Sequence, residues 1–348
     1  MFARNVWYVA AWSSEVTADK PFGRRILNEP VAFYRKTDGT AVALFDRCCH
    51  RGYPLTRGRI IGSNLQCGYH GIEFNCEGTC VKIPGQETIP SRAKVRSFPV
   101  EEKDGLIWIW MGDAERAQQT PVPGYQWHTD ERWGWKGTTF LIKSNHLYLS
   151  DNLLDASHLG YVHLKTVGGN PGIHDKTAMK VERTDRSVTV SRLLPDTPPA
   201  PTYTKMANIT CNIDRWQDIH FQPGLICVDV GATKVGTGQT AEGRANAMFE
   251  FRVANGVTPE TEHTTHYFWS AAQSLNPSDS AVTQAMYDEI EKTFREDWEV
   301  IEAQYERLLE APDWRTVDVN NDVASVQARR IYDSLVREEC EVGTASPS

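Results

Sequence analysis

The sequence predicts an α+β protein of two domains, in which strands dominate the first domain and a long helix closes the second. Three observations carry this prediction. Short strand-like segments separated by turns fill the first third of the chain, breaker residues gather at 114–127, and an amphipathic run extends over 281–309 near the C-terminus. A chain of 348 residues is also long enough for about two domains.

The strand-like segments are rich in β-branched and aromatic residues and are bounded by turn residues. In the first third they lie at 31–36, 41–47, 64–70 and 105–112, and the last of these alternates in the manner of a half-buried strand. The segment 114–127 contains Pro121, Pro123 and Gly124. We place the domain boundary there and expect domains at 1–115 and 116–348.

Beyond this boundary, strands are predicted at 186–194, 224–231 and 265–273, and the last of them leads into the helix at 281–309. The segment 236–243 is rich in glycine, but its third glycine is misplaced for a nucleotide-binding loop and a surface turn is expected. The chain is therefore expected to carry neither a flavin nor a nicotinamide site of its own.

Composition excludes several classes of function. The net charge is −8 without a cluster of lysine or arginine, so nucleic acid is not an expected partner. Nowhere do 18 apolar residues run together, so no membrane span is expected. The N-terminal segment lacks the features of a signal peptide, and five of the eight cysteines lie within 48–80. This cysteine pattern favours thiolate ligands in a reducing cytoplasm over disulfides.

Two Cys-His pairs stand out in the first domain. One residue separates Cys48 from His50, two separate Cys67 from His70, and sixteen lie between the pairs. Such pairs on neighbouring loops suit a tetrahedral zinc site, although zinc modules more often open with two cysteines and close with two histidines. The alternating order favours a two-iron cluster, in which two thiolates bind one iron and two neutral imidazoles bind the other. Zinc and unligated core histidines are the alternatives.

Two further histidines interrupt an apolar segment at 151–163. His158 and His163 are five residues apart, which separates them by about 140° around an ideal helix. Both reach one metal ion only if the helix ends or bulges between them, and Gly160 makes such a distortion easier. Two histidines and one carboxylate on one face of a metal are the ligands of oxygen-activating Fe(II) sites. A pair of unrelated core histidines is the alternative.

The missing carboxylate is expected on the helix at 281–309. The apolar stripe of this helix comprises Met286, Ile290, Phe294, Ile301, Tyr305 and Leu308. Steps of three or four residues carry the stripe through Asp297, and an acid on the core face needs a positive partner, so Asp297 is predicted as the third ligand. The acids that fall off the stripe are expected to be solvated: Asp288, Glu289, Glu296 and Glu299.

Asp155 has a different predicted role. A metal-bound imidazole usually donates its second N–H to a carboxylate, and Asp155 lies one helical turn before His158. We therefore expect Asp155 to accept that hydrogen bond. Asp151 is expected to be a surface or capping residue.

These patterns resemble the motifs of Rieske non-haem iron oxygenases, in the stretches LQCGYHGIEFN and DNLLDASHLGYVH above all. The resemblance covers nearly the whole chain and is closest to the oxygenase subunits of the vanillate O-demethylase and toluenesulfonate methyl-monooxygenase type. It implies an N-terminal antiparallel-β Rieske [2Fe-2S] domain followed by a helix-grip α+β catalytic domain with mononuclear Fe(II). Cys49 stands where relatives usually have proline, and it is expected to pack beside the cluster as an inert thiol.

The resemblance also implies partners. In a head-to-tail homotrimer, Asp155 would link His158 to His70 of the partner subunit, with Asn152 close to the iron. A separate NADH-dependent reductase, bearing flavin and a plant-type [2Fe-2S] cluster, would supply electrons. With O2, the enzyme would hydroxylate or O-demethylate a methyl or methoxy group on an aromatic acid. The alternatives are a ring-hydroxylating dioxygenase or N-demethylase of the same family and, outside enzymes, an electron carrier or a zinc-dependent binding module.

One departure from the family concerns the substrate. Relatives often carry an Arg-Asn pair after the strand HYFW, where this chain has Gln273 and Ser274. Asn255 falls where one relative places a substrate-contacting histidine, so Asn255 is a candidate substrate contact, with a turn asparagine as the alternative.

Overall fold

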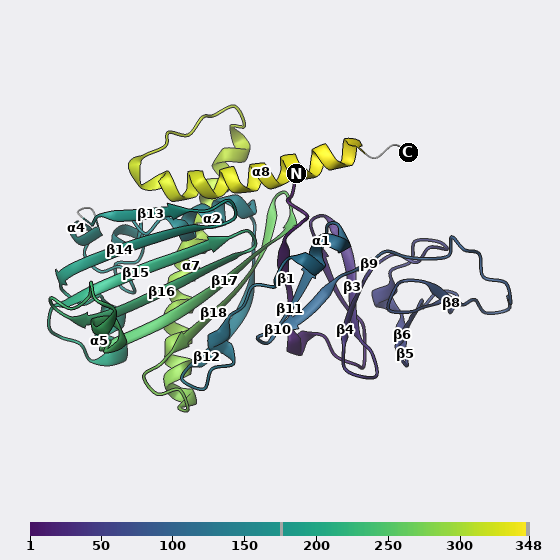
Figure 1. Cartoon of the computed structure of the whole chain (residues 1–348), viewed down its shortest axis with the longest axis horizontal. Helices are drawn as coiled ribbons and strands as arrows, with labels where there is room; N and C mark the ends of the chain where they lie inside the picture. Colours follow the sequence, from purple (N-terminus) through teal and green to yellow (C-terminus); the bar gives the residue numbers. More distant parts are fainter. Residues whose placement is uncertain (175–176, 346–348) are drawn as a thin grey trace. The chain divides into compact units, whose positions relative to one another are not determined.

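The computed structural model describes residues 1–174 and 177–345, whose helices and strands are labelled in Figure 1. The chain forms two compact units. The first comprises Met1–Gly124, Thr258–Glu262 and the residues from Glu339 on, and the second comprises Tyr125–Val257 and His263–Glu338. The segment 114–127 contains the short helix α1 (Ala114–Gln119), and the first unit ends at the breaker Gly124. Among the described helices, none combines the length and apolarity needed to cross a membrane.

The first unit is built from three small antiparallel sheets. The strands of the first, in spatial order, are β1 (Trp7–Trp12), β11 (Leu106–Trp110) and β10 (Val100–Lys103). Those of the second are β2 (Phe22–Ile26), β3 (Glu29–Arg35), β4 (Ala41–Phe45) and β9 (Ser97–Phe98). Those of the third are β5 (Arg59–Ile61), β6 (Asn64–Gln66), β7 (Glu73–Phe74) and β8 (Cys80–Lys82). Two short 3-10 turns complete the unit, at Ser13–Glu15 and Leu55–Arg57.

The interpretation of 105–112 as a half-buried strand is wrong. All five residues of β11 are buried, because β11 is the central strand between β1 and β10 and both of its faces are covered. Alternation of side chains marks a strand with one wet face, and it does not apply to a central strand of this kind.

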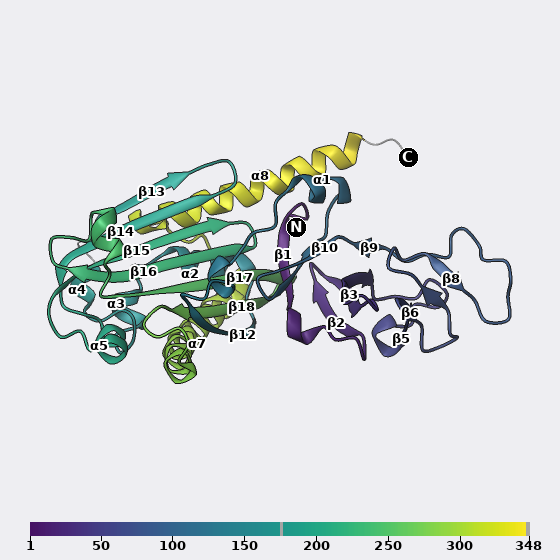
Figure 2. The ribbon, with the colours of Figure 1, turned by 60° about the horizontal axis from the view of Figure 1, so that its bottom comes forward.

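The second unit is a seven-stranded antiparallel sheet with helices packed against it (Figures 1 and 2). The strands, in spatial order, are β12 (Gly134–Ile142), β18 (Thr264–Gln273), β17 (Phe249–Thr261), β16 (Leu225–Lys234), β15 (Ile213–Gln222), β14 (Val188–Thr197) and β13 (Met179–Arg183). The helices are α2 (His146–Leu154), α3 (Leu159–Val162), α4 (Pro171–His174), α5 (Pro201–Ala207), α6 (Ala241–Ala245), α7 (Ser280–Glu310) and α8 (Val323–Ala345). Short 3-10 turns lie at Gln126–His128 and Asn320–Asp322. The predicted α+β class is confirmed.

Helix α7 is the element that positions the site. It begins at the side-chain cap of Asp279, which accepts from the backbone N–H of Ala281 at 2.8 Å. Aromatic contacts hold it on the sheet: the ring of Phe294 lies 5.2 Å from that of Trp269 and 5.5 Å from that of Tyr267, both on β18. Such rings bury large apolar areas and interlock, which fixes the rotation of α7 about its axis. Figure 1 shows α7 passing behind the strands, across one face of the sheet.

The sheet predicts one sharp stability effect, at Gly231 on β16. Gly231 lies opposite Trp216 of β15, and a Cβ built on it would lie 2.0 Å from the Trp216 ring. We expect Gly231→Ala to destabilise the chain by about 1–3 kcal/mol, because the buried indole has to shift. Thermal unfolding of the full chain measures the effect. Gly172→Ala is the matched control, since its Cβ would meet only Asn170 Oδ1 at 3.6 Å. An equal change in both variants would contradict the packing argument.

Candidate active site and metal centres

The two Cys-His pairs lie on two loops of the same design. The first follows β4 and the second joins β6 to β7. In each, the glycine four residues after the cysteine donates to the cysteine carbonyl, over 2.9 Å in Gly52 and 3.1 Å in Gly71. These glycines have φ of 69° and 70°, a region that residues with a Cβ rarely adopt. The sequence therefore builds the same turn twice, and each turn carries one cysteine and one histidine.

The loops turn the thiols inward and the imidazoles outward. Cys48 and Cys67 are buried in a cluster with Leu65 and Phe74, whereas His50 and His70 are exposed, with ring centroids 4.7 Å apart. Burial raises the pKa of the Cys48 thiol to about 12. A thiol in this position ionises only when a metal ion compensates its charge. Two buried thiols facing two imidazoles thus suit a two-iron cluster with mixed ligands.

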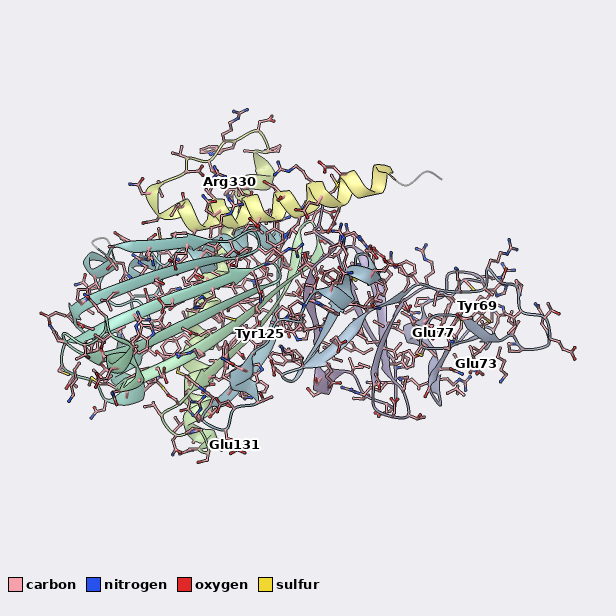
Figure 3. The ribbon with its side chains drawn as sticks, in the orientation of Figure 1. Tyr69, Glu73, Glu77, Tyr125, Glu131 and Arg330 are labelled. Atoms are coloured by element: carbon pink, nitrogen blue, oxygen red, sulfur yellow. The ribbon has the colours of Figure 1, made fainter. Side chains whose placement is uncertain are left out.

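The surroundings of these loops clarify the remaining cysteines. Cys80 is buried and Cys76 packs against the same apolar cluster, as expected for inert thiols. Cys49 is exposed, as are His50 and His70, whereas Cys48 turns into the core. The expectation that the Cys49 thiol packs beside the iron-sulfur cluster stays a prediction. Tyr69, labelled in Figure 3, packs against His70 with ring centroids 3.8 Å apart and the two rings tilted by 36°, and it is largely exposed.

In the second unit the segment 151–163 does not form one helix. Helix α2 ends at Leu154, and Asp155 is extended, with φ −100° and ψ 104°. The carboxylate of Asp155 accepts from the backbone N–H of Ser157 at 2.7 Å and from its hydroxyl at 2.8 Å. This local turn competes with helix continuation. The expectation that Asp155 and His158 share one helical turn is therefore wrong, and among the described residues no hydrogen bond joins them.

The short helix α3 then separates the two histidines. His158 lies just before it, and His163 just after it, where the helix has ended. Gly160 serves packing rather than distortion, since a Cβ on it would lie 2.7 Å from Pro171 Cα. The chain direction changes between the two histidines, and their rings therefore converge from different directions.

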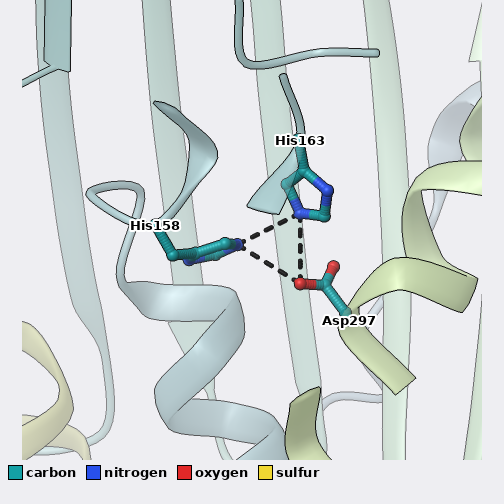
Figure 4. A group of neighbouring side chains, drawn as sticks. All are labelled: His158, His163 and Asp297. Carbon is teal, nitrogen blue, oxygen red and sulfur yellow. Dashed lines mark hydrogen bonds and ion pairs between the residues drawn. The ribbon is translucent and has the colours of Figure 1, made fainter. Parts of the chain in front are cut away.

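Three ligand atoms meet at this point, as Figure 4 shows. His158 Nε2 lies 3.2 Å from His163 Nε2, and Asp297 Oδ1 lies 3.3 Å from the first and 3.1 Å from the second. Ligands about 2.1 Å from one ion and at right angles to one another stand about 3 Å apart. The triangle therefore has the dimensions of one face of an octahedral site, which is the arrangement of two-histidine, one-carboxylate iron centres.

The electrostatics of the triad also suit a cation. Burial alone favours the neutral acid, but hydrogen bonds to the two imidazoles hold the pKa of Asp297 well below its usual range. Burial likewise opposes a charged His163, yet its hydrogen bonds to Asp297 and Glu296 raise the pKa of His163. Asp297 and His163 therefore both favour positive charge at the centre of the triad, which a bound metal ion would supply. Asn152 donates to Asp297 Oδ1 at 3.0 Å, while its own Oδ1 is buried without a partner among the described residues.

Two acids of α7 that were expected to be solvated have polar partners within the unit, so the expectation is wrong for them. Glu296 Oε2 lies 2.8 Å from His163 Nδ1 and 3.2 Å from Thr166 Oγ1, so Glu296 accepts the second N–H of a ligand imidazole. Glu289 is buried, accepts from Thr202 Oγ1 and pairs with Lys205.

Asp151, on α2, forms an ion pair with Arg329, with Arg329 Nε 3.0 Å from Asp151 Oδ2.

A cavity adjoins the triad. Its walls are mostly apolar, with Val228, Val230, Phe251 and Val253 from the sheet and Ile290 and Phe294 from α7. Asn255 lies on this wall, but its amide already donates to Ile226 O at 3.0 Å and accepts from Tyr267 OH at 2.7 Å. Gln273 is buried elsewhere, where it bonds Asn276 and Thr283.

Sequence reasoning missed the polar residues of this wall. Arg215 and Gln217 of β15 also line the cavity, at alternate positions with Ile219. No strand was predicted at 213–222, so no sequence pattern placed Arg215 and Gln217 on the same face of a sheet as Ile219. Neither was singled out.

The triad predicts a graded response to substitution. Asp297→Ala should lose the mononuclear iron entirely, because a direct ligand is removed. Glu296→Ala should retain the iron with about 10- to 100-fold weaker affinity, because only the orientation of His163 is relaxed. Iron per chain is measured after dialysis against increasing chelator, with the visible spectrum of the cluster at Cys48–His70 as internal reference. Glu299→Ala, exposed on the same helix, is the control. Equal losses in Glu296→Ala and Glu299→Ala would contradict the specific role of Glu296.

The comparisons with known proteins agree with this architecture. Residues 6–99 match the Rieske [2Fe-2S] domain, and residues 142–338 match the vanillate O-demethylase oxygenase C-terminal domain. The toluene-4-sulfonate monooxygenase system iron-sulfur subunit of Comamonas testosteroni is 38% identical, over 97% of this chain and 98% of the relative. The vanillate O-demethylase oxygenase subunit of Pseudomonas sp. strain HR199 is 34% identical, over 99% and 98%.

A solved structure extends the likeness to three dimensions. Dicamba monooxygenase bound to 3,6-dichlorosalicylic acid superposes with a TM-score of 0.90 at 32% identity, covering 97% of this chain and 99% of that one. The same enzyme has been solved with non-haem iron and dicamba, with a TM-score of 0.82 at 31% identity and coverage of 98% and 99%. The chain therefore belongs to the Rieske non-haem iron oxygenases, as an oxygenase component with a [2Fe-2S] cluster and a mononuclear iron, related to the vanillate O-demethylase and toluenesulfonate monooxygenase components.

Proposed function

We propose that this oxygenase hydroxylates or O-demethylates a methyl or methoxy group on an aromatic acid. The observation that carries the proposal is the triad of His158, His163 and Asp297 at the wall of a largely apolar cavity. An iron held by these residues would supply the activation of O2, with electrons from the Rieske cluster bound by Cys48, His50, Cys67 and His70. The relatives named for toluene-4-sulfonate, vanillate and dicamba support an aromatic acid as substrate.

The protein's own contribution is geometry and exclusion of water. Val230, Phe251 and Phe294 give the substrate ring an apolar surface. Asn152 holds Asp297 through one hydrogen bond, and Asn255, fixed by its two hydrogen bonds, contacts the substrate from β17. A methoxy group hydroxylated on its carbon collapses to a phenol and formaldehyde. The sum is ArOCH3, O2, NADH and H⁺ giving ArOH, HCHO, H2O and NAD⁺.

The electrons come from a separate protein, because the chain is an oxygenase component. We infer a reductase with flavin and a plant-type [2Fe-2S] cluster, oxidising NADH in the cytoplasm, where thiolate ligands stay reduced. A ring-hydroxylating dioxygenase or N-demethylase is not favoured by the relatives. An electron carrier or zinc-dependent module is not favoured either, since neither accounts for a catalytic domain match over 142–338.

We further propose a head-to-tail homotrimer in which Asp155 joins His158 to His70 of the partner subunit. A heterologous interface of this kind closes into a ring. Support comes from a second groove, on which Asp155 and His158 both lie together with Tyr148, Trp314 and Arg329. The two residues thus border both the inner cavity and this groove. Because Ser157 occupies only part of the acceptor capacity of Asp155, its carboxylate can accept a further N–H.

The function is tested with the purified oxygenase, a compatible reductase and NADH. We expect substrate-dependent consumption of O2 and NADH with 4-methoxybenzoate or 4-methylbenzenesulfonate. The first should yield one formaldehyde per phenol. Labelled O2 should place one atom in the hydroxymethyl product of the second, whereas with the first the labelled atom leaves in the formaldehyde and the phenol keeps its original, unlabelled oxygen. Two labelled atoms on the ring would identify a dioxygenase, and turnover confined to N-methyl heterocycles would identify an N-demethylase.

Asp155→Asn isolates the proposed electron route. The amide is nearly the same size, so both metals should remain, while the negative acceptor is lost. A carboxylate that orients a metal ligand typically matters by about 10- to 100-fold, and we expect a larger loss because electron transfer is affected as well. The cluster is reduced chemically and mixed with O2 and substrate, and its reoxidation is followed in a single turnover. Asp151→Asn, in the same groove, is the control. Wild-type reoxidation in Asp155→Asn would exclude the route.

A further inference from the structure

Two side chains on the cavity wall each carry a buried polar atom that lacks a hydrogen-bond partner among the described residues. Arg215 and Gln217 lie two residues apart on β15 and therefore point to the same face of the sheet. Their exposed fractions are only 3% and 4%. Arg215 Nε and Gln217 Oε1 are both buried, and neither has a hydrogen-bond partner among the described residues. Buried polar atoms are almost always paired, so this pair of orphans at a cavity indicates a missing ligand.

The charge of Arg215 is also uncompensated within the described part of the chain. No carboxylate there lies within ion-pair distance of its guanidinium. Its Cζ lies 5.0 Å from the centroid of the Tyr203 ring, a contact that holds the guanidinium in place but does not neutralise it. A buried cation without a counter-ion is costly, and the fold therefore keeps Arg215 at a cost in stability that needs a functional reason.

A second buried arginine adds to the imbalance. Arg192 of β14 donates to the carbonyl oxygen of His174 at 3.0 Å and feels the charges of both Asp155 and Arg215. Burial, together with the repulsion from Arg215, lowers the pKa of Arg192 even though Asp155 opposes this effect. Arg192 therefore feels one carboxylate and one further guanidinium, and no ion pair is formed by Arg215 in the described part of the chain. This part of the sheet has an excess of positive charge, which an anion in the cavity would balance.

We propose that Arg215, assisted by Gln217, binds the acid group of the substrate and so decides both substrate class and orientation. A guanidinium presents a planar fork of N–H donors that matches two oxygens of a carboxylate or a sulfonate. Because β15 supplies one wall of the cavity and α3 and α7 supply the triad on another, an aromatic acid held at Arg215 directs its remaining substituents away from the sheet. The inference rests on the proposed function, to which it adds the residue that recognises the acid.

The test compares an anion with a neutral molecule of the same shape. Binding of 4-methoxybenzoate, 4-methylbenzenesulfonate and 4-methoxybenzamide to the holoenzyme is measured by calorimetry. Wild type should bind each acid at least about 30-fold more tightly than the amide, as expected for a buried, hydrogen-bonded charge pair. Arg215→Met should lose that preference while its affinity for the amide changes little. Arg215→Lys, which keeps the charge but not the fork, should lie between.

The matched control is Arg252→Met. Arg252 also lies on a strand of this sheet, β17, but it pairs with Asp229 and Glu250 and does not line the cavity. It should retain the wild-type preference. Both metals and the thermal midpoint show whether each variant is folded. If Arg215→Met does not fold, the proposal is judged from the preference of wild type for the acids over the amide and from the smaller preference expected of Arg215→Lys.

The outcomes separate the two proposals. A wild type that neither binds nor oxidises any of the three compounds contradicts the proposed function. A wild type that oxidises the acids but binds the amide equally well overturns the anchor alone. The same holds if Arg215→Met keeps the full preference for the acids.

Discussion

The buried carboxylate of Asp297 is the constraint on which the second unit depends. An ionised acid on an apolar helix face is strongly destabilising unless opposite charge compensates it. It cannot turn to solvent, because Phe294, one turn earlier on α7, is locked between Tyr267 and Trp269. Groups that compensate the negative charge therefore have to approach the Asp297 carboxylate inside the unit. His158 and His163 do so from the two ends of α3, and this requires the chain to leave the helix at Asp155.

The turn at Asp155 has two consequences. It ends α2 early enough for His158 to approach Asp297 from one side while His163 approaches from another. It also places Asp155 and His158 on the lining of two hollows, the cavity beside the triad and the second groove. A continuous helix would have turned the two imidazoles away from each other by well over a right angle. The local hydrogen bonds between Asp155 and Ser157 thus help to bring His158 and His163 together at the metal site.

Sequence reasoning succeeded where one periodicity or one spacing decided the outcome. The predicted helix at 281–309 corresponds to α7 (Ser280–Glu310), and its buried face includes Asp297 together with Met286 and Ile290. The two Cys-His spacings likewise correspond to two similar turns. Helical periodicity, however, identifies only the face of a helix that packs against one apolar surface. Glu296 and Glu289 flank the stripe of α7 and meet polar partners on α5 and beside α3, which only the tertiary structure supplies.

The second unit also separates charge across its cavity. Asp297, Glu296 and Asp155 bring negative charge to the helix side, and Arg215 and Arg192 bring positive charge to the sheet side. Carboxylates are themselves good ligands for hard cations, so an aromatic acid that entered the cavity acid-first could occupy the metal positions left open by the triad. Attraction by the arginines of the sheet side opposes that orientation, whereas a metal ion bound by the triad offsets the carboxylates of the helix side. Low dielectric strengthens the attraction. The same arrangement of charges therefore selects an anionic substrate and keeps its acid group away from the metal.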